Sequence, residues 1–396
     1  MISPLTIDAQ ELEYRYHLQV YNRLPITIKR AQGALVWDEE GKEYIDLLAG
    51  IAVNNVGHAH PRMIKAIQKA ATEPLHLSNF YYTASQSKLA QKLATSTGLD
   101  RVFFCNSGAE TMESCIKLAR KWGLKHQKNG NIVSLSNGFH GRTMSTITMS
   151  SQKYQKGFDP LPSGFIQASF NDIQSLRSVL NSDTIAIAFE LIQGNSGVYP
   201  AQVEFVHEIQ QICKENQILL IIDEVQTGVG RTGKMWCYEH FNIQPDIVAS
   251  AKALAGGIPI GAMMAKEEIA NCMNAGEHGT TFGGNPFACS VALENLAIIE
   301  DESLIEEAAK KGDYFIEKLR QLSKVHSCIT QVRGKGLMIG LELDRPTAPL
   351  VFEWAKKGVL SNSAGGQSFR IVPPLNIPYS LIDRAVERLD EVLQEL

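Results

Sequence analysis

The sequence has little of what would direct it to a membrane, a nucleic acid or a metal ion. Its 396 residues carry 38 Lys and Arg against 42 Asp and Glu, so the net charge of -4 offers polyanions no excess of basic groups. The seven cysteines are scattered with no C-x-x-C pair, which indicates neither a zinc framework nor a disulfide scaffold. No run reaches the roughly 18 apolar residues of a membrane-spanning helix. We therefore expect no nucleic-acid, membrane or metal partner.

Signals for secretion and repetition are also missing. The first sixteen residues carry acidic side chains early and no apolar core, so we expect a cytoplasmic, globular protein without a secretion signal. There is no internal repeat, low-complexity tract or Pro/Ser-rich linker. At about 100–200 residues per domain, the length predicts two domains, or one large α/β domain with a smaller companion.

Short apolar runs alternate with helical patterns over the middle of the chain. Between the apolar runs at 185–192 and 218–225, Val203, Val206 and Ile209 share one face of a helix. Buried apolar strands separated by amphipathic helices predict a mainly parallel sheet covered on both faces. The expected strands of this sheet lie at 101–107, 131–136, 185–192, 218–225 and 246–250.

The pattern changes after Pro286. Two helical stretches cover 287–322, a strand follows at 332–343, and a helix closes the chain from residue 380. This mixture is typical of an α+β unit rather than of a continued parallel sheet.

The N-terminal fifty residues read as a short helix and then a hairpin that turns at Gly41. We predict two domains, a large α/β domain over 51–290 and a smaller α+β domain formed by 1–50 together with 291–396.

The segment 228–233, GVGRTG, matches two nucleotide-binding patterns incompletely. It has the glycine spacing of a dinucleotide fingerprint, but the strand before it ends in Asp223 and Glu224, whose carboxylates would repel a pyrophosphate. It also nearly forms a P-loop, yet Met235 stands where a hydroxyl should bind Mg²⁺. A glycine-rich connection is the better interpretation.

Two further patterns are weak. His58 and His60 lack a third ligand nearby, so loop histidines next to Pro61 explain them better than a metal pair. No G-x-S-x-G occurs, and a hydrolase of the ordinary α/β kind would therefore have no nucleophile.

A strand-to-helix junction at Ser107, Gly108 and Ala109 is suited to an anion. Small residues let a ligand approach the backbone closely, and a helix N-terminus offers free N–H groups and a dipole that favours negative charge. Simple capping by Ser107 explains the segment equally well. From this segment alone both interpretations stay open.

Two ionisable side chains follow apolar strands, where α/β proteins bind ligands. Asp223 ends one run, and a carboxylate there needs hydrogen bonds or a cation such as a protonated ring nitrogen. Lys252 follows the next run in small, apolar surroundings where its charge is costly, and a Schiff base removes much of that cost. An ion-paired or snorkelling lysine would explain an isolated example.

The phosphate-ready helix start, the acid and the lysine together describe a pyridoxal phosphate site. In such a site the acid stabilises the pyridinium that makes the ring an electron sink, and the lysine holds the aldehyde. The combination is far less expected by chance than any single member.

On these residues the sequence resembles class-III aminotransferases of pyridoxal-phosphate fold type I, most closely the acetylornithine/ornithine aminotransferase branch. The resemblance covers nearly the whole chain and implies a large cofactor-binding domain with a mainly parallel sheet and a smaller α+β domain. The specific signatures, in the family's order, are NSGAETMESCIKLAR, FHGRT, IIDEVQTGVGRTG, SAKAL and GTTFGGNP.

The resemblance implies a role for each residue around the cofactor ring. Lys252 matches the Schiff-base lysine, and Asp223 matches the acid on the pyridine nitrogen. Gln226 matches the contact to the ring hydroxyl. Val225 and Phe139 match the residues that pack on the two faces of the ring.

The resemblance also implies how the phosphate is held and how the protein assembles. Gly108 and Ala109, next to Ser107, match the phosphate-binding turn. Thr281 matches a threonine that reaches the phosphate of the neighbouring subunit, which implies a homodimer with shared active sites.

For the substrate, Arg370 matches the family's α-carboxylate arginine, and Arg142 matches a second carboxylate-binding arginine. The guanidinium fork suits a carboxylate better than lysine does, although each arginine alone would be read as a surface ion pair. Glu190 matches a family glutamate near the cofactor.

Two positions decide the substrate expected from the resemblance. Asn195 stands where the branch commonly has a glutamate thought to neutralise the α-carboxylate arginine, so the amino donor is open at this point. Ile51 stands where ornithine aminotransferases have a tyrosine, and an apolar residue there favours an N-acylated ornithine.

The expected reaction is ping-pong transfer of the ω-amine of N-acetylornithine to 2-oxoglutarate, giving N-acetylglutamate semialdehyde and glutamate in arginine metabolism. The alternative is an aminotransferase for another ω-amine: ornithine, N-succinylornithine, 4-aminobutyrate or a protected lysine. More distant alternatives are an amine-shifting isomerase, a binding protein on an enzyme scaffold and a nicotinamide oxidoreductase.

Overall fold

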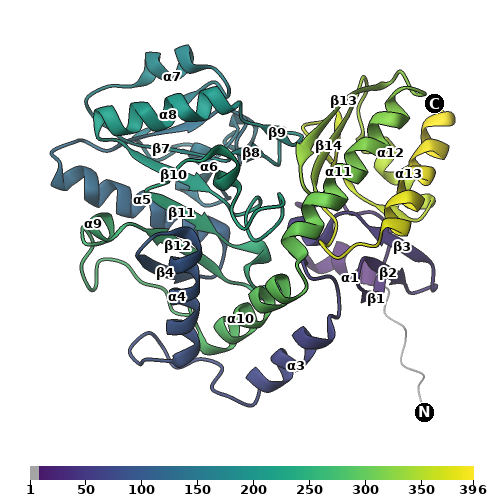
Figure 1. Ribbon diagram of the computed structural model, residues 1–396, viewed down its shortest axis with the longest axis horizontal. Coiled ribbons are helices and arrows are strands. Elements are labelled where there is room, and N and C mark those ends of the chain that lie inside the picture. The colour runs from purple at the N-terminus through teal and green to yellow at the C-terminus, as the bar shows by residue number, and fades with distance from the viewer. Residues whose placement is uncertain (1–8) are drawn as a thin grey trace.

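The computed structural model describes residues 9–396, and the first half of the segment read above for a secretion signal lies outside this range. Figure 1 shows two lobes, a larger one around a wide sheet and a smaller one that contains the C-terminal helices and the first three strands. Among the described residues, no helix combines the length and the apolar character needed to cross a membrane.

The larger lobe is built on a seven-stranded sheet that confirms the predicted fold class. Every neighbouring pair is parallel except the two pairs made by β12, which is antiparallel to both of its neighbours. In spatial order the strands are β4 (Arg101–Cys105), β12 (Gly261–Ala265), β11 (Ile247–Ser250), β10 (Leu219–Asp223), β7 (Thr184–Phe189), β5 (Asn131–Leu135) and β6 (Phe165–Ala168).

Both faces of this sheet are buried, as the continuous apolar runs predict. Leu219 and Ile221 of β10 belong to an apolar cluster with α5 (Gly108–Lys125), whereas Leu220 and Ile222 belong to the cluster that includes α8 (Val203–Asn216). Further helices around the sheet are α4 (Ala84–Thr97), α6 (Met144–Met149), α7 (Ile173–Val179), α9 (Glu267–Ala270) and α10 (Pro286–Asp301).

The smaller lobe contains two four-stranded sheets. One sheet has the order β1 (Ile28–Gln32), β2 (Leu35–Asp38), β3 (Glu43–Asp46) and β15 (Val359–Leu360). The other has the order β13 (Ile329–Lys335), β14 (Met338–Leu343), β17 (Ser368–Ile371) and β16 (Asn362–Ala364). They are flanked by α11 (Leu304–Ser323), α12 (Ala348–Lys356) and α13 (Tyr379–Gln394).

The remaining elements are short or connect the lobes. They are α1 (Ala9–Tyr16), α2 (Ala49–Ala52), α3 (Pro61–Ala70), β8 (Ile192–Gln193), β9 (Tyr199–Pro200) and the 3-10 turns η1 (Gln152–Tyr154), η2 (Cys237–Phe241) and η3 (Lys252–Ala255).

The hairpin predicted at Gly41 is confirmed, because Val36 pairs with Tyr44 across it. The single strand predicted at 332–343 is wrong. The chain forms two antiparallel strands there, β13 and β14, which reverse at Gly336. Gly336 has a φ of +52°, in the left-handed region that favours glycine, and this turn is what the apolar pattern did not reveal.

Candidate active site

The predicted site residues follow strands whose carboxyl ends share one edge of the large sheet. β12 is antiparallel to both neighbours, so β4 runs in the same direction as β11, β10, β7 and β5. Ser107, Phe139, Glu190, Asp223 and Lys252 stand at or just after the ends of these five strands. This common edge is the physical reason why residues far apart in the sequence lie close together.

Asp223 is buried and held by two hydrogen bonds. Its Oδ2 lies 2.7 Å from Nδ1 of His140, and its Oδ1 accepts from the backbone N–H of Val225 at 3.0 Å. Burial opposes protonation of His140, but the hydrogen bond to Asp223 and the negative charges of Asp223 and Glu190 outweigh it and raise the pKa of the imidazole. The carboxylate therefore has a fixed orientation.

His140 is a site residue that the sequence interpretation missed. Its imidazole is almost fully buried, and its Nε2 has no hydrogen-bond partner within the described chain. The available signal was its place inside FHGRT, directly after Phe139.

Lys252 has its amine free in the described structure. No hydrogen bond or ion pair joins its Nζ to residues 9–396, and burial, aided by the charge of Arg370, lowers its pKa to about 8. Its φ is +43°, a strained left-handed conformation for a residue other than glycine. An amine with a lowered pKa and no partner among the described residues is suited to covalent attachment of a carbonyl ligand.

Helix α5 begins at the predicted junction, and the capping interpretation of Ser107 is correct. Its hydroxyl oxygen accepts from the N–H of Glu110 at 3.2 Å. A Cβ on Gly108 would lie 2.7 Å from Cγ1 of Val225, so only glycine allows this contact. The first N–H groups of the helix have no carbonyl partner within the helix, and an anion can therefore bind there as well.

Arg370 brings a buried guanidinium from β17 of the smaller lobe to this edge. It is 2% exposed, and its Nη1 donates to Oε1 of Gln226 at 3.4 Å while its Nε donates to Oδ1 of Asn362 at 3.2 Å. Burial lowers its pKa to about 10. Within the described chain no carboxylate forms an ion pair with it, so its charge is available to a bound carboxylate.

Glu190 is a buried carboxylate whose charge interacts with those of Asp223 and Arg370. Its two oxygens accept the N–H groups of Phe139, at 2.9 Å, and Gly194, at 3.3 Å. Burial raises its pKa to about 7, although His140 counteracts this. Glu190 thus orients the segments that carry Phe139 and Asn195.

Arg142 is exposed and stacks on two aromatic rings. Its guanidinium carbon lies 4.0 Å from the ring centre of Tyr154 and 5.4 Å from that of Phe139. Asn195 donates from its amide to the hydroxyl of Tyr154. Tyr154 was not predicted, because it lies in a short turn with no motif around it.

Thr281 is exposed and forms no hydrogen bond with the other predicted site residues within the described chain. Its neighbour Thr280 accepts from the side chain of Asn106 at 3.2 Å, so this loop lies beside the start of α5. The two histidines considered for a metal site have carboxylate partners instead: His58 with Asp46 and His60 with Glu302.

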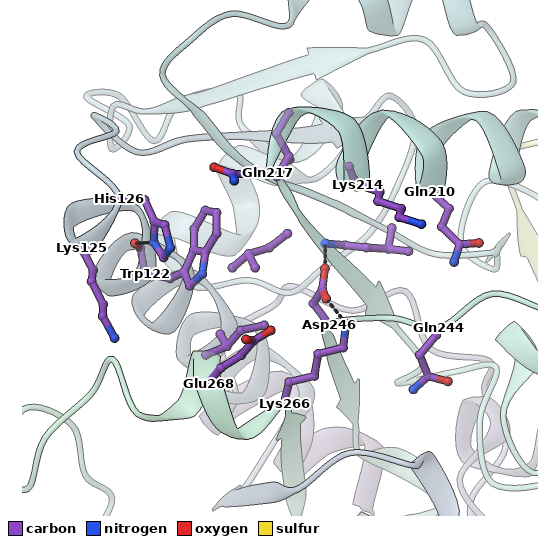
Figure 2. A pocket seen from close by; sticks show the side chains of 15 residues that line it. Trp122, Lys125, His126, Gln210, Lys214, Gln217, Gln244, Asp246, Lys266 and Glu268 are labelled. Atoms are coloured by element: carbon purple, nitrogen blue, oxygen red, sulfur yellow. Dashed lines mark hydrogen bonds and ion pairs between the residues drawn. The ribbon is translucent and has the colours of Figure 1, made fainter.

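One cavity lies away from this edge, at the amino ends of β10 and β11. Figure 2 shows this pocket of about 560 Å³ beside Trp122 and His126. Asp246 inside it already binds the amine of Lys266 at 2.5 Å and the N–H of Leu220 at 2.8 Å. These contacts join the starts of β10 and β11, so Asp246 has a structural role in the sheet.

The residues at the carboxyl edge fit pyridoxal phosphate. Lys252 provides an amine without a partner for an aldehyde, Asp223 provides an oriented carboxylate for a ring nitrogen, and the start of α5 provides N–H groups for a phosphate. The hydroxyl of Ser250, two residues before this lysine, is buried and has no partner in the described chain. Fold and site therefore define an enzyme of the pyridoxal-phosphate fold type I.

Comparisons with known proteins agree with this class. The family model for class-III aminotransferases matches residues 17–393. The acetylornithine aminotransferase of Methanocaldococcus jannaschii is 47% identical over 389 residues, which cover 98% of each chain.

Two solved structures are similar over almost their full length. Acetylornithine aminotransferase from Elizabethkingia anophelis has a TM-score of 0.88 at 34% identity, with 98% of both chains covered. An ornithine aminotransferase from Toxoplasma gondii, with partial occupancy of PLP at its active site, has a TM-score of 0.94 at 32% identity, with 98% of this chain and 93% of that chain covered. The chain belongs to the class-III aminotransferase family, as its resemblance predicted, and its cofactor is pyridoxal phosphate.

Proposed function

We propose that this aminotransferase moves the ω-amine of N-acetylornithine to 2-oxoglutarate and acts in arginine biosynthesis. The products are N-acetylglutamate semialdehyde and glutamate. The observation that carries the proposal is the buried guanidinium of Arg370, which has no carboxylate partner among residues 9–396, at the same edge as the amine of Lys252. The names of the Methanocaldococcus and Elizabethkingia relatives support the same donor.

Lys252 is the proposed proton carrier. When bound, pyridoxal phosphate supplies an electron sink for the carbon that loses a proton. A pKa of about 8 populates both forms of the amine near neutral pH, so Lys252 can accept a proton and return it. Asp223, oriented by His140, supplies the negative charge that stabilises a protonated ring nitrogen.

Two further groups of residues are proposed to hold the cofactor. Ser107, Gly108 and Ala109 bind its phosphate at the start of α5. Phe139 and Val225 cover the two faces of the ring.

Gln226 is proposed to contact the ring hydroxyl from its buried position next to Arg370. Arg370 and Arg142 bind the substrate carboxylates, and Glu190 orients the surrounding backbone through its two hydrogen bonds. Ile51, an apolar residue, favours an N-acylated donor over a free α-amine.

We also propose a homodimer in which Thr281 reaches the phosphate site of the second copy. Exposed apolar side chains support this, because segment 75–82 exposes several rings and aliphatic chains and Phe282 is exposed as well. His76 and Phe282 have ring centres 5.3 Å apart, and the amide of Asn79 donates to the carbonyl of Thr280 at 3.2 Å. Exposed patches of this kind mark association surfaces.

The domain division and the location are proposals as well. The large cofactor-binding domain is 51–290, and the small α+β domain combines 1–50 with 291–396. A cytoplasmic location is supported by the seven cysteines, which are all buried as free thiols and suit a reducing compartment.

The test is an absorbance titration of the cofactor-loaded protein with one amine at a time. Conversion of the cofactor from its aldehyde form to its amine form at low N-acetylornithine concentration, with little conversion by ornithine, is the expected result. N-succinylornithine and 4-aminobutyrate are measured in parallel. Conversion by another amine alone would overturn the donor and leave the aminotransferase class intact.

The second candidate is an aminotransferase for a different ω-amine, and Asn195 favours it. An amide next to Tyr154 cannot supply the negative charge that a glutamate would place near Arg370. The same titration separates the two candidates.

A further inference from the structure

The segment GVGRTG at 228–233, which fits neither nucleotide motif, has an unexplained buried charge. Arg231 in this segment is fully buried, with 0% of its surface exposed. Within the described chain no carboxylate pairs with it, and burial lowers its pKa to about 9. The charge of Asp46 offsets part of the cost of burying this guanidinium, and its hydrogen bonds must account for the rest.

Those bonds join three distant parts of the chain. Nη1 of Arg231 donates to the carbonyls of Leu337, at 2.9 Å, and Pro373, at 2.5 Å. Nη2 donates to Oδ1 of Asn55 at 2.5 Å. The backbone takes part too, because Leu337 donates its N–H to the carbonyl of Arg231 at 3.1 Å.

The backbones on the two sides are in direct contact here. A Cβ added to Gly336 would lie 2.4 Å from the carbonyl carbon of Thr232, so no larger residue fits without displacing the loop. Asn55 adds a bond in the opposite direction, from its amide to the carbonyl of Val229 at 2.7 Å. The loop after β10 is thus fastened to the smaller lobe at several points.

The residues that Arg231 contacts lie next to β17, which carries Arg370, and next to its partner strand β14. Pro373 follows Arg370 by three residues, and Leu337 directly precedes β14, in which Gly340 pairs with Arg370 of β17. Arg231 therefore fixes both strands of this pair relative to the loop after β10, and hence relative to Asp223.

We propose that Arg231 is a positioning residue that holds Arg370 in place for the substrate carboxylate. The planar guanidinium donates to the two carbonyls and to the amide oxygen at the same time. A lysine has its donors on one nitrogen atom and does not span these three acceptors. This proposal rests on the carboxylate-binding role of Arg370 in the proposed function.

The experiment follows the reaction of L-glutamate with cofactor-loaded Arg231→Met in a stopped-flow spectrometer. We expect the apparent Kd for glutamate to rise at least tenfold, because Arg370 loses its position. The limiting rate at saturation and the Kd for pyridoxal phosphate should stay within about threefold, because the lysine and aspartate belong to the other lobe. Arg231→Lys should give an intermediate value.

Two variants keep the result interpretable. Asn55→Ser removes one of the three contacts and should raise the glutamate Kd about threefold, so it serves if Arg231→Met does not fold. Phe315→Leu loosens a fully buried position of α11 and removes none of the hydrogen bonds of Arg231, so it should lower the Tm with the glutamate Kd unchanged.

A fall in the limiting rate at constant Kd, or an equal rise in Kd for Phe315→Leu, would overturn the positioning role. Arg370→Lys separates a failure of the proposed function from a failure of the proposed role of Arg231. If it leaves the glutamate Kd unchanged, the proposed function is wrong at this residue. If it raises the Kd while Arg231→Met does not, only the present inference fails.

Discussion

At the scale of single residues, burial decides what each ionisable group can do. The amine of Lys252 and the guanidinium of Arg370 both have lowered pKa values because burial penalises their charge. Glu190 has a raised pKa for the same reason. Lys252 and Glu190 are therefore kept near their titration points, which suits proton transfer, whereas Arg370 with a pKa of about 10 stays charged for a substrate carboxylate.

Replacing Lys252 tests its proposed chemistry directly. Lys252→Ala should abolish transamination, because no other free amine of the described chain stands at this edge, while far-ultraviolet circular dichroism should remain unchanged. Removal of the buried amine also predicts a Tm equal to or above that of the parent protein, because its charge is costly to bury.

Lys266→Ala is the matched control. This lysine forms an ion pair with Asp246 at the opposite edge of the sheet, so its loss should leave the turnover rate unchanged. Retained turnover in Lys252→Ala would remove that lysine from the mechanism.

At the scale of elements, the ends of strands and helices carry the site, and the sequence located most of them. The five predicted strands of the large sheet are present because long apolar runs leave little choice for a buried segment. Strand β12 was not predicted, since its sequence GAMMA lacks β-branched residues and only its neighbours make it a strand. The sequence predicted one strand where the structure has β13 and β14, because the apolar pattern continues across the tight glycine turn between them.

The start of α5 offers a steric test of the proposed cofactor site. Gly108→Ala places a methyl group 2.7 Å from Cγ1 of Val225 and should displace that side chain from the proposed ring face. We expect the Kd for pyridoxal phosphate, measured by equilibrium dialysis, to rise about tenfold or more, which corresponds to about 1.4 kcal/mol. Helix stability should not suffer, because alanine is the better helix former.

The double variant Gly108→Ala with Val225→Ala isolates the cause. Shortening Val225 makes room for the new methyl group, so affinity for the cofactor should recover in part relative to Gly108→Ala. No recovery, or an unchanged Kd in the single variant, would show that the close contact does not govern cofactor binding.

At the scale of the whole molecule, contacts between remote segments assemble the smaller lobe and complete the site. Ile45 of β3 pairs with Val359 of β15, more than three hundred residues later, and Val372 donates its N–H to the carbonyl of Leu47 at 2.7 Å. These pairings bring the N-terminal segment beside the strand that ends near Arg370. No local pattern encodes them.

One buried carboxylate links overall stability to pH. Glu224 accepts hydrogen bonds from Thr227 and from the N–H of Tyr238, and burial raises its pKa to about 7 from an ordinary value of 4.5. A raised carboxyl pKa adds stability at low pH that is lost as pH rises from about 4.5 through 7. Glu224→Gln removes the titrating group and with it this loss of stability. The Tm of the variant minus the Tm of the parent should therefore increase from pH 5.5 to pH 7.5.

Thermal unfolding of both cofactor-loaded proteins at three pH values measures that difference. The other titrating groups are common to both proteins and cancel. A difference in Tm that stays constant or falls with pH would contradict the assigned titration.

The proposed homodimer predicts the effect of a charge on the exposed apolar surface. Phe80 is 91% exposed, and Phe80→Asp should shift the protein toward monomer in analytical ultracentrifugation because a carboxylate would be desolvated at the interface. Val325→Asp, at a 74% exposed position after α11, is the control and should leave association unchanged. Monomeric parent protein at all concentrations would exclude the dimer.

The sequence by itself determined the fold class, the family and the strand ends that carry Asp223 and Lys252, because apolar runs and short motifs are local properties of the chain. Only the tertiary structure showed that His140 orients Asp223, that Asn195 binds Tyr154 and that Arg231 joins three remote segments. Such contacts depend on which side chains meet across elements, and distances between remote residues exist only once the chain has folded.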